Sequence, residues 1–295
     1  MKSSIWIAGL LSILTPGVGH LYAGRPRRGI LLWLVLSGFL LTLPVAFLFA
    51  PTPIMLVAFW LPIGVWLFIV LEAVRIVRSH TGPIQRRRYN RWYVYIVAIL
   101  VVALVIQPAE VRVTRTMART FTITSGSMGA TLLAGDYVVL NAMAAGRARH
   151  NDIITFSWPD DDLLFISRVV GLPGTTVAMQ RGVLHIDGVP QQEPNVRHID
   201  PAGDAYHEWM QWQMPYVATT VDLTAYRPTR DQWGPILVPG DSYFVLGDNR
   251  DESLDSRYLG FVPADRILGR VQRVYFSWDA DAGGVRWHRL GQKIR

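Results

Sequence analysis

Three long apolar runs near the start of the chain constrain its fold more than any other feature of the sequence. They cover residues 29–50, 53–74 and 91–109, and the first contains no charged residue. A membrane-spanning helix needs about 20 predominantly apolar residues, so each run predicts one crossing, within a membrane region over residues 1–110. Residues 1–22 are also apolar, but proline, glycine and histidine interrupt them. The alternatives there are a tilted, a re-entrant or an interfacial helix.

Basic residues in the loops predict which way these helices cross. One group of arginines, at positions 25, 27 and 28, precedes the first run, and a second group lies between the second and third runs, at positions 75–91. Three crossings place both loops on the same side, and the positive-inside rule makes that side cytoplasmic. The rest of the chain is then expected outside the membrane. The formal net charge of +7 therefore indicates membrane topology, with the lipid bilayer as a partner and no nucleic acid.

Beyond the apolar runs the pattern changes to short β-branched or aromatic segments bounded by Gly, Pro, Asp or Asn. Such segments are typical of strands, and they predict a β-rich domain over residues 111–295. The predicted strands are residues 137–140, 153–158, 164–170, 183–186, 243–246 and 271–278. Residues 188–240 differ, because tryptophans, methionines and prolines lie there among polar residues; we expect an inserted lobe. The chain has no cysteine, which excludes disulfides and thiolate metal sites.

The stretch around which the domain is organised is FTITSGSMGATLLAGD, residues 121–136. It predicts a strand that ends in a Ser-Gly-Ser-Met turn, then a Gly-Asp turn and a second strand. A turn of small polar residues between apolar runs can expose the hydroxyls of Ser125 and Ser127 at a rim. An exposed serine can serve as a nucleophile when a base, oxyanion donors and a substrate groove surround it. Serines in turns more often only satisfy the local backbone.

Two later blocks of sequence favour a functional interpretation of this turn. They are FISRVVGLPG, residues 165–174, and GDNRDESLDSRYLG, residues 247–260. In this order, the three blocks resemble the bacterial type I signal peptidases, which are membrane-anchored serine endopeptidases that cut leader peptides from exported proteins. The resemblance covers roughly residues 122–278.

The resemblance implies a fold, a substrate and a set of site residues. The fold is N-terminal transmembrane α-helices followed by a mostly β, coiled-sheet catalytic domain on the outer side of the cytoplasmic membrane. The substrates are preprotein leader peptides cut after small residues, and neither a cofactor nor a metal is expected. By motif match, Ser127 is the nucleophile and Ser125 the side-chain oxyanion donor. Ser253, Asp255 and Arg257 support the site.

Two positions depart from the family pattern. Gly129 and Ala130 stand where the family usually has proline before Thr-Leu, and this loosens the turn because alanine does not fix φ. Ser167 occupies the position of the family's general-base lysine. A buried lysine can accept a proton near neutral pH, whereas a serine hydroxyl cannot do so usefully. The chain has two lysines, Lys2 and Lys293, and only the second follows the apolar runs.

Three explanations of the missing lysine are open. The chain is a catalytically impaired relative, acting as a peptide-binding or membrane partner protein; it recruits another base; or it carries an engineered change, which the altered turn makes the least favoured. The alternative bases outside the membrane region are His150, His185, His198 and His207. The two function hypotheses are therefore a leader-cleaving serine endopeptidase and a non-catalytic peptide binder.

Overall fold

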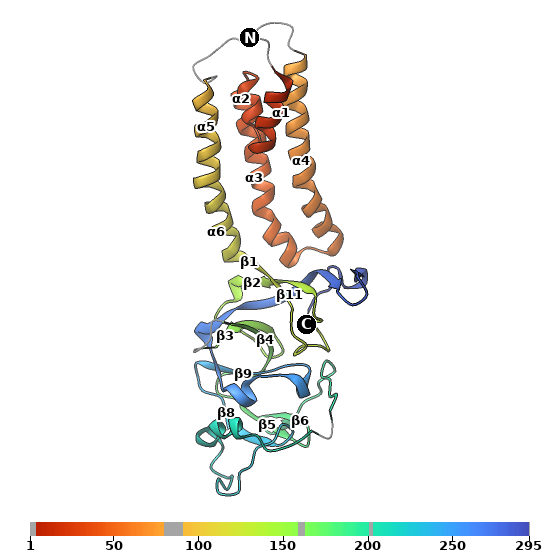
Figure 1. The fold of residues 1–295 in the computed structure, drawn as a ribbon. Coiled ribbons are helices and arrows are strands. Elements are labelled where there is room, and N and C mark those ends of the chain that lie inside the picture. The colour runs from red at the N-terminus through yellow and green to blue at the C-terminus, as the bar shows by residue number, and fades with distance from the viewer. Residues whose placement is uncertain (1–3, 80–90, 159–162, 201–202, 295) are drawn as a thin grey trace. The chain divides into compact units, whose positions relative to one another are not determined.

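The computed structural model describes residues 4–79, 91–158, 163–200 and 203–294. The arginines at positions 86–88, which belong to the second predicted basic loop, lie outside these residues, as does Lys2. Contacts divide the chain into two compact units, Met1–Met117 and Ala118–Arg295. The first unit is helical and the second is mostly antiparallel sheet (Figure 1). The predicted fold class is confirmed.

The first unit contains three helical stretches long and apolar enough to cross a membrane, which are Pro26–Phe49, Thr52–Arg78 and Trp92–Met117. The first two are α3 and α4, while the third joins α5 (Trp92–Val101), a π-helical turn (Val102–Ile106) and α6 (Gln107–Met117). The third helix continues beyond the apolar run that predicted it, because helical hydrogen bonding does not depend on apolar side chains.

The interrupted segment at the start forms two short helices, α1 (Ile5–Leu14) and α2 (Val18–Tyr22). Gly17 joins them with a φ of +90°, and a Cβ at this position would overlap the carbonyl oxygen of Gly29 in α3. Glycine is therefore required here both for its backbone conformation and for the close approach of α3. The tight turn at Gly17 accounts for one of the interruptions in the apolar segment 1–22.

The larger sheet of the second unit has the strand order β1-β2-β11-β3-β4-β9-β10, with β12 paired to β11. Its pairs are antiparallel. The strands are β1 (Ala118–Thr122), β2 (Asp136–Asn141), β3 (Ile153–Ser157), β4 (Leu164–Gly171), β9 (Ser242–Leu246), β10 (Val262–Pro263), β11 (Ile267–Asp279) and β12 (Gly284–Val285). The predicted strands that fall in this sheet are confirmed to within a few residues at their ends.

A second sheet has the order β7-β6-β5-β8. Its strands are β5 (Thr176–Gln180), β6 (Val183–Ile186), β7 (Val189–Pro190) and β8 (Trp233–Leu237). Residues 188–240, expected as an inserted lobe, supply β7 and β8 and a 3₁₀-helix at Glu208–Tyr216. The buried Trp233 stacks on Phe244 of β9, with ring centroids 5.1 Å apart. The two sheets therefore share a hydrophobic core.

Candidate active site

The Ser-Gly-Ser-Met turn follows directly after β1. The side chain of Met128 is 1% exposed and packs in a core cluster with Ile123 and Leu132. This buried anchor leaves Ser127 half-buried and Ser125 exposed. Their hydroxyl oxygens lie 3.1 Å apart, within hydrogen-bond distance. The turn thus presents two adjacent hydroxyls at the surface of a rigid core.

A cavity of about 300 Å³ opens beside these hydroxyls. One wall consists of residues 122–125, 127 and 128, and the other consists of residues 163–167 at the start of β4 together with Leu254. Ser127 and Ser167 line the same cavity although they lie on different elements. The structure therefore brings together the two positions that the motifs single out. Among the described residues that line the cavity, none carries a titratable side chain.

The side chains weighed as substitutes for lysine lie elsewhere. Lys293 is exposed, in a terminal segment that bridges to Arg273 of β11. Each of the four histidines has a ring nitrogen in another contact, and none lines the cavity. Those contacts join His150 to the Val170 carbonyl, His185 to the Val183 carbonyl, His198 to the Asp251 carboxylate and His207 to the Trp209 N–H.

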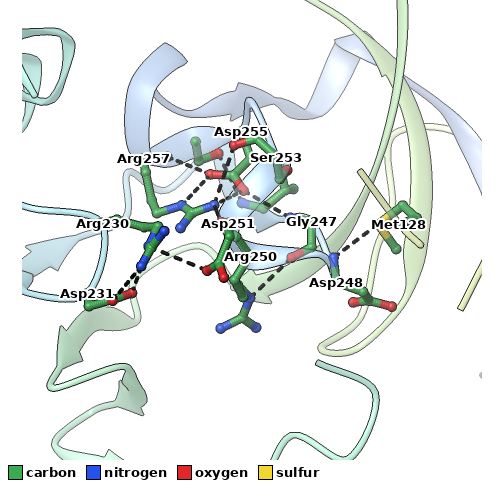
Figure 2. A network of polar contacts seen from close by, with 12 residues as sticks. Met128, Arg230, Asp231, Gly247, Asp248, Arg250, Asp251, Ser253, Asp255 and Arg257 are labelled. Carbon is green, nitrogen blue, oxygen red and sulfur yellow. Dashed lines mark hydrogen bonds and ion pairs between the residues drawn. The ribbon is translucent and has the colours of Figure 1, made fainter. Parts of the chain in front are cut away.

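The acidic block contains a fully buried ion pair between Asp255 and Arg257 (Figure 2). Arg257 donates from Nε to Oδ1 over 2.9 Å and from Nη2 to Oδ2 over 2.8 Å. Burial alone would lower the pKa of Arg257, but the charge and hydrogen bonds of Asp255 outweigh it and raise the pKa. Asp255 also accepts from the Gly247 N–H, and Arg257 donates to the Arg250 carbonyl. The pair therefore fixes the path of the whole block.

Further contacts bind this block to the Ser-Gly-Ser-Met turn and to the residues that follow it. Asp248 accepts two 2.7 Å hydrogen bonds from Arg168, the neighbour of Ser167, and also accepts one from the Thr131 hydroxyl. The Asn249 backbone N–H donates to the Ser127 carbonyl over 3.0 Å. The position of Ser127 thus depends on residues more than 100 positions later in the chain.

Ser253 is 7% exposed, and its hydroxyl has no hydrogen-bond partner within the described part of the chain. A Cβ at Gly247 would overlap this hydroxyl and would lie 2.6 Å from the Ser127 carbonyl oxygen. Glycine at 247 therefore allows Ser253 to approach the backbone of Ser127 closely. A buried hydroxyl without a partner is costly, so stability does not explain its placement beside the backbone of Ser127.

Sequence reasoning missed two side chains near the turn. Asn249 donates from Nδ2 to the Gly126 carbonyl over 3.1 Å and to Glu252 Oε2 over 3.0 Å. Both residues lie in the acidic block that the motifs single out, but the contact of Asn249 with Gly126 joins segments too far apart in the chain to leave a pattern in the sequence.

One group of side chains in the described residues has metal-ligand spacing, namely His198, Asp231 and Asp251. Arg230 lies 3.4 Å from Asp251 and 3.1 Å from Asp231. These carboxylates therefore already have a cationic partner, so the cluster is better explained as an ion-pair network than as a metal site.

A family model described as signal peptidase, peptidase S26 matches residues 90–278. The chain therefore belongs to the S26 signal peptidases, and the resemblance to type I signal peptidases is confirmed. The match leaves α1 to α4 outside it.

Similar proteins include the signal peptidase I of Rickettsia rickettsii, which is 26% identical over 245 residues, covering 70% of this chain and 88% of that protein. The signal peptidase I of Pseudomonas aeruginosa is 31% identical over 196 residues, covering 54% and 64%. A crystal structure of a signal peptidase I from Enterococcus faecalis is 30% identical and covers 42% of this chain and 96% of that one, with a TM-score of 0.28.

Proposed function

We propose that this chain is a membrane-bound serine endopeptidase that removes leader peptides from exported proteins after small residues. The observation that carries the proposal is the pair of hydroxyls, Ser125 and Ser127, 3.1 Å apart beside a cavity of about 300 Å³. The opposite wall of the cavity begins with apolar side chains at residues 163–166. Such a wall suits an extended peptide with small apolar side chains.

In this mechanism the Ser127 hydroxyl attacks the scissile carbonyl carbon and forms an acyl-enzyme, which water then hydrolyses. Ser125 Oγ and the backbone N–H of Ser127 donate to the oxyanion that develops on the carbonyl oxygen. Asp255 and Arg257 act through the backbone, by holding the acidic block against the turn, and the Ser253 hydroxyl lies beside the backbone of Ser127. No cofactor takes part in this scheme.

The proposed location follows from the helices and their flanking charges. The stretches Pro26–Phe49, Thr52–Arg78 and Trp92–Met117 each suffice to span the bilayer. Exposed arginines flank the first stretch at its start and the second at its end, for example Arg27 and Arg78. The positive-inside rule puts these ends in the cytoplasm, so a third crossing delivers the β-rich unit to the outer side. Leader peptides emerge on that side, with the lipid bilayer as the second partner and no nucleic acid.

A second candidate function is that of a catalytically impaired relative which binds leader peptides without cutting them. The observation that favours it is the lack of a titratable side chain among the described residues lining the cavity. General-base catalysis is worth roughly 10²–10⁴-fold in rate, so the loss of the lysine alone could silence the site.

Cleavage of a preprotein with an Ala-x-Ala site by the full chain in detergent distinguishes the two functions. Cleavage that is lost in Ser127→Ala supports the peptidase. Peptide binding that survives the substitution, with no cleavage in either protein, supports the second function. A chain that neither binds nor cleaves the preprotein would contradict both.

A further inference from the structure

We infer that Glu252 is the general base that accepts the proton of Ser127 in this chain. The inference rests on the proposed peptidase function and names the group that takes the place of lysine. It starts from a hydrogen-bonded connection between the carboxylate and the nucleophile turn.

The amide of Asn249 makes this connection. Its Nδ2 donates both to the carbonyl of Gly126, over 3.1 Å, and to Oε2 of Glu252, over 3.0 Å. Gly126 lies between the two serines of the turn, and Oε2 lies 4.0 Å from the position that a Cβ on Gly126 would take. The carboxylate therefore lies beside the backbone of the turn that carries both hydroxyls, and it does not itself line the cavity.

The other carboxylates of the acidic block are already neutralised by arginines. Asp248 pairs with Arg168, and Asp255 pairs with Arg257. Asp251 lies 3.4 Å from Arg230 and accepts from two backbone N–H groups. A carboxylate in such a pair is a poor proton acceptor, because protonation would leave the arginine without its counter-charge.

Glu252 differs from these three aspartates. It is exposed, and the described part of the chain gives it a neutral amide as partner and no cation. One oxygen accepts from Asn249, and no described residue donates to the other. An exposed glutamate can turn about its side-chain bonds, and a general base can act directly or through one water molecule. The carboxylate thus has both the freedom and the lone pair that the reaction needs.

The proton transfers balance in both half-reactions. The Glu252 carboxylate takes the hydroxyl proton as Ser127 Oγ bonds to the scissile carbonyl carbon. The resulting carboxylic acid gives that proton to the leaving amine as the C–N bond breaks. In deacylation the carboxylate takes a proton from the attacking water and returns it to Ser127 Oγ as the ester bond breaks. No other reactant is required.

The test is the substitution Glu252→Gln in two backgrounds, the natural chain and Ser167→Lys. Glutamine keeps the length and an oxygen that accepts from Asn249, but it cannot take up a proton. In the natural chain we expect preprotein cleavage to fall by about 10²–10⁴-fold. In the Ser167→Lys background, where the amine supplies a base, the loss should be less than about 10-fold. Glu208→Gln, at an exposed glutamate in the lobe, serves as the matched control and should leave cleavage unchanged.

Equal losses in the two backgrounds would show that Glu252 has a structural role, and they would overturn the inference. A natural chain that is inactive while Ser167→Lys cleaves would overturn the inference and leave the proposed function standing. If neither chain cleaves the preprotein, both proposals fail. Thermal unfolding of each variant shows whether a loss of cleavage comes from a loss of the fold.

Discussion

The two walls of the cavity beside Ser127 differ in their polar groups and in the contacts that hold them. On the turn wall, the carbonyl groups of Gly126 and Ser127 accept hydrogen bonds from Asn249, and buried Met128 anchors the backbone. On the β4 wall, residues 163–166 are apolar, and Ser167 is the one polar side chain among the described residues there.

This difference shows that the support of the turn does not depend on the residue at position 167. The contacts that hold the turn come from the acidic block, through Asp248 and Asn249, and they do not involve the side chain of Ser167. Replacing the base therefore need not disturb the nucleophile. The predictions below test each wall in turn.

The largest expected effect is on the turn wall. Ser127→Ala removes the attacking oxygen and should reduce preprotein cleavage by on the order of 10⁴-fold or more. Peptide affinity should change only slightly, because alanine leaves the shape of the cavity intact. Initial cleavage rates and equilibrium binding of a leader peptide measure the two quantities. Cleavage that persists at the natural rate would mean that another group attacks the carbonyl.

The next prediction concerns the β4 wall. Ser167→Lys places an amine in the cavity beside Ser127, where burial favours the neutral form. Because we infer that Glu252 already serves as a base, we expect cleavage to rise by less than the roughly 10²–10⁴-fold that a general base is worth. Ser167→Met, with a similar length and no amine, is the control. A rate for the lysine variant no higher than that of the methionine variant would mean that the walls are not arranged for catalysis.

A smaller loss is expected at the second hydroxyl of the turn. Ser125→Ala removes one oxyanion donor and should lower kcat by about 10²–10³-fold with little change in KM. Ser125→Thr keeps a hydroxyl and should retain more activity than alanine. A substitution that raises KM and leaves kcat unchanged would instead assign Ser125 to ground-state binding.

Much of the fold was predictable because its signals are local. Apolar runs long enough to span a bilayer and short β-branched segments can be recognised from neighbouring residues alone. The strand β8 was not predicted, because its local signals are misleading: it contains Gly234 and Pro235, which are typical of turns. Long-range pairing with β5 and the burial of Trp233 hold it in place. Whether such a segment forms a strand depends on its tertiary contacts.

The site was predictable only where its residues form contiguous motifs. The turn, the lysine position and the acidic block could be found from the sequence, and the cavity brings Ser127 and Ser167 together. The hydrogen bond from Asn249 to Gly126 could not be predicted, because it joins residues 123 positions apart. Such a contact can be recognised only once the fold is known.

Breaking the buried Asp255–Arg257 pair is also expected to lower the stability of the fold. Asp255→Asn leaves Arg257 buried and uncompensated, and breaking a buried pair typically costs about 3–5 kcal/mol of unfolding free energy. Denaturant unfolding of the full chain in detergent measures the change. Asp281→Asn, at an exposed aspartate, should be neutral. A similar small change in both variants would show that the pair does not hold the block.

The smallest expected effect is a pH dependence at the junction between the lobe and the acidic block. Asp251 accepts from the backbone N–H groups of Ile199 and Asp200 over 2.5 and 2.6 Å and lies near Arg230. Burial alone would raise the pKa of Asp251, but these hydrogen bonds and the charge of Arg230 lower it below its usual value. A carboxyl group with a lowered folded-state pKa stabilises the fold above its unfolded pKa, and it loses that contribution as the pH falls through the folded value.

The test of this junction compares Asp251→Asn with the natural chain. The unfolding free energy of the natural chain should fall more steeply as the pH drops below about 4, the ordinary range of an aspartate, because the amide of the variant does not titrate. Above that range the variant should be less stable, since asparagine accepts these hydrogen bonds without the negative charge. Denaturant unfolding across this pH range measures both differences. Parallel pH curves for the two proteins would show that the charge of Asp251 does not stabilise the junction between the lobe and the acidic block.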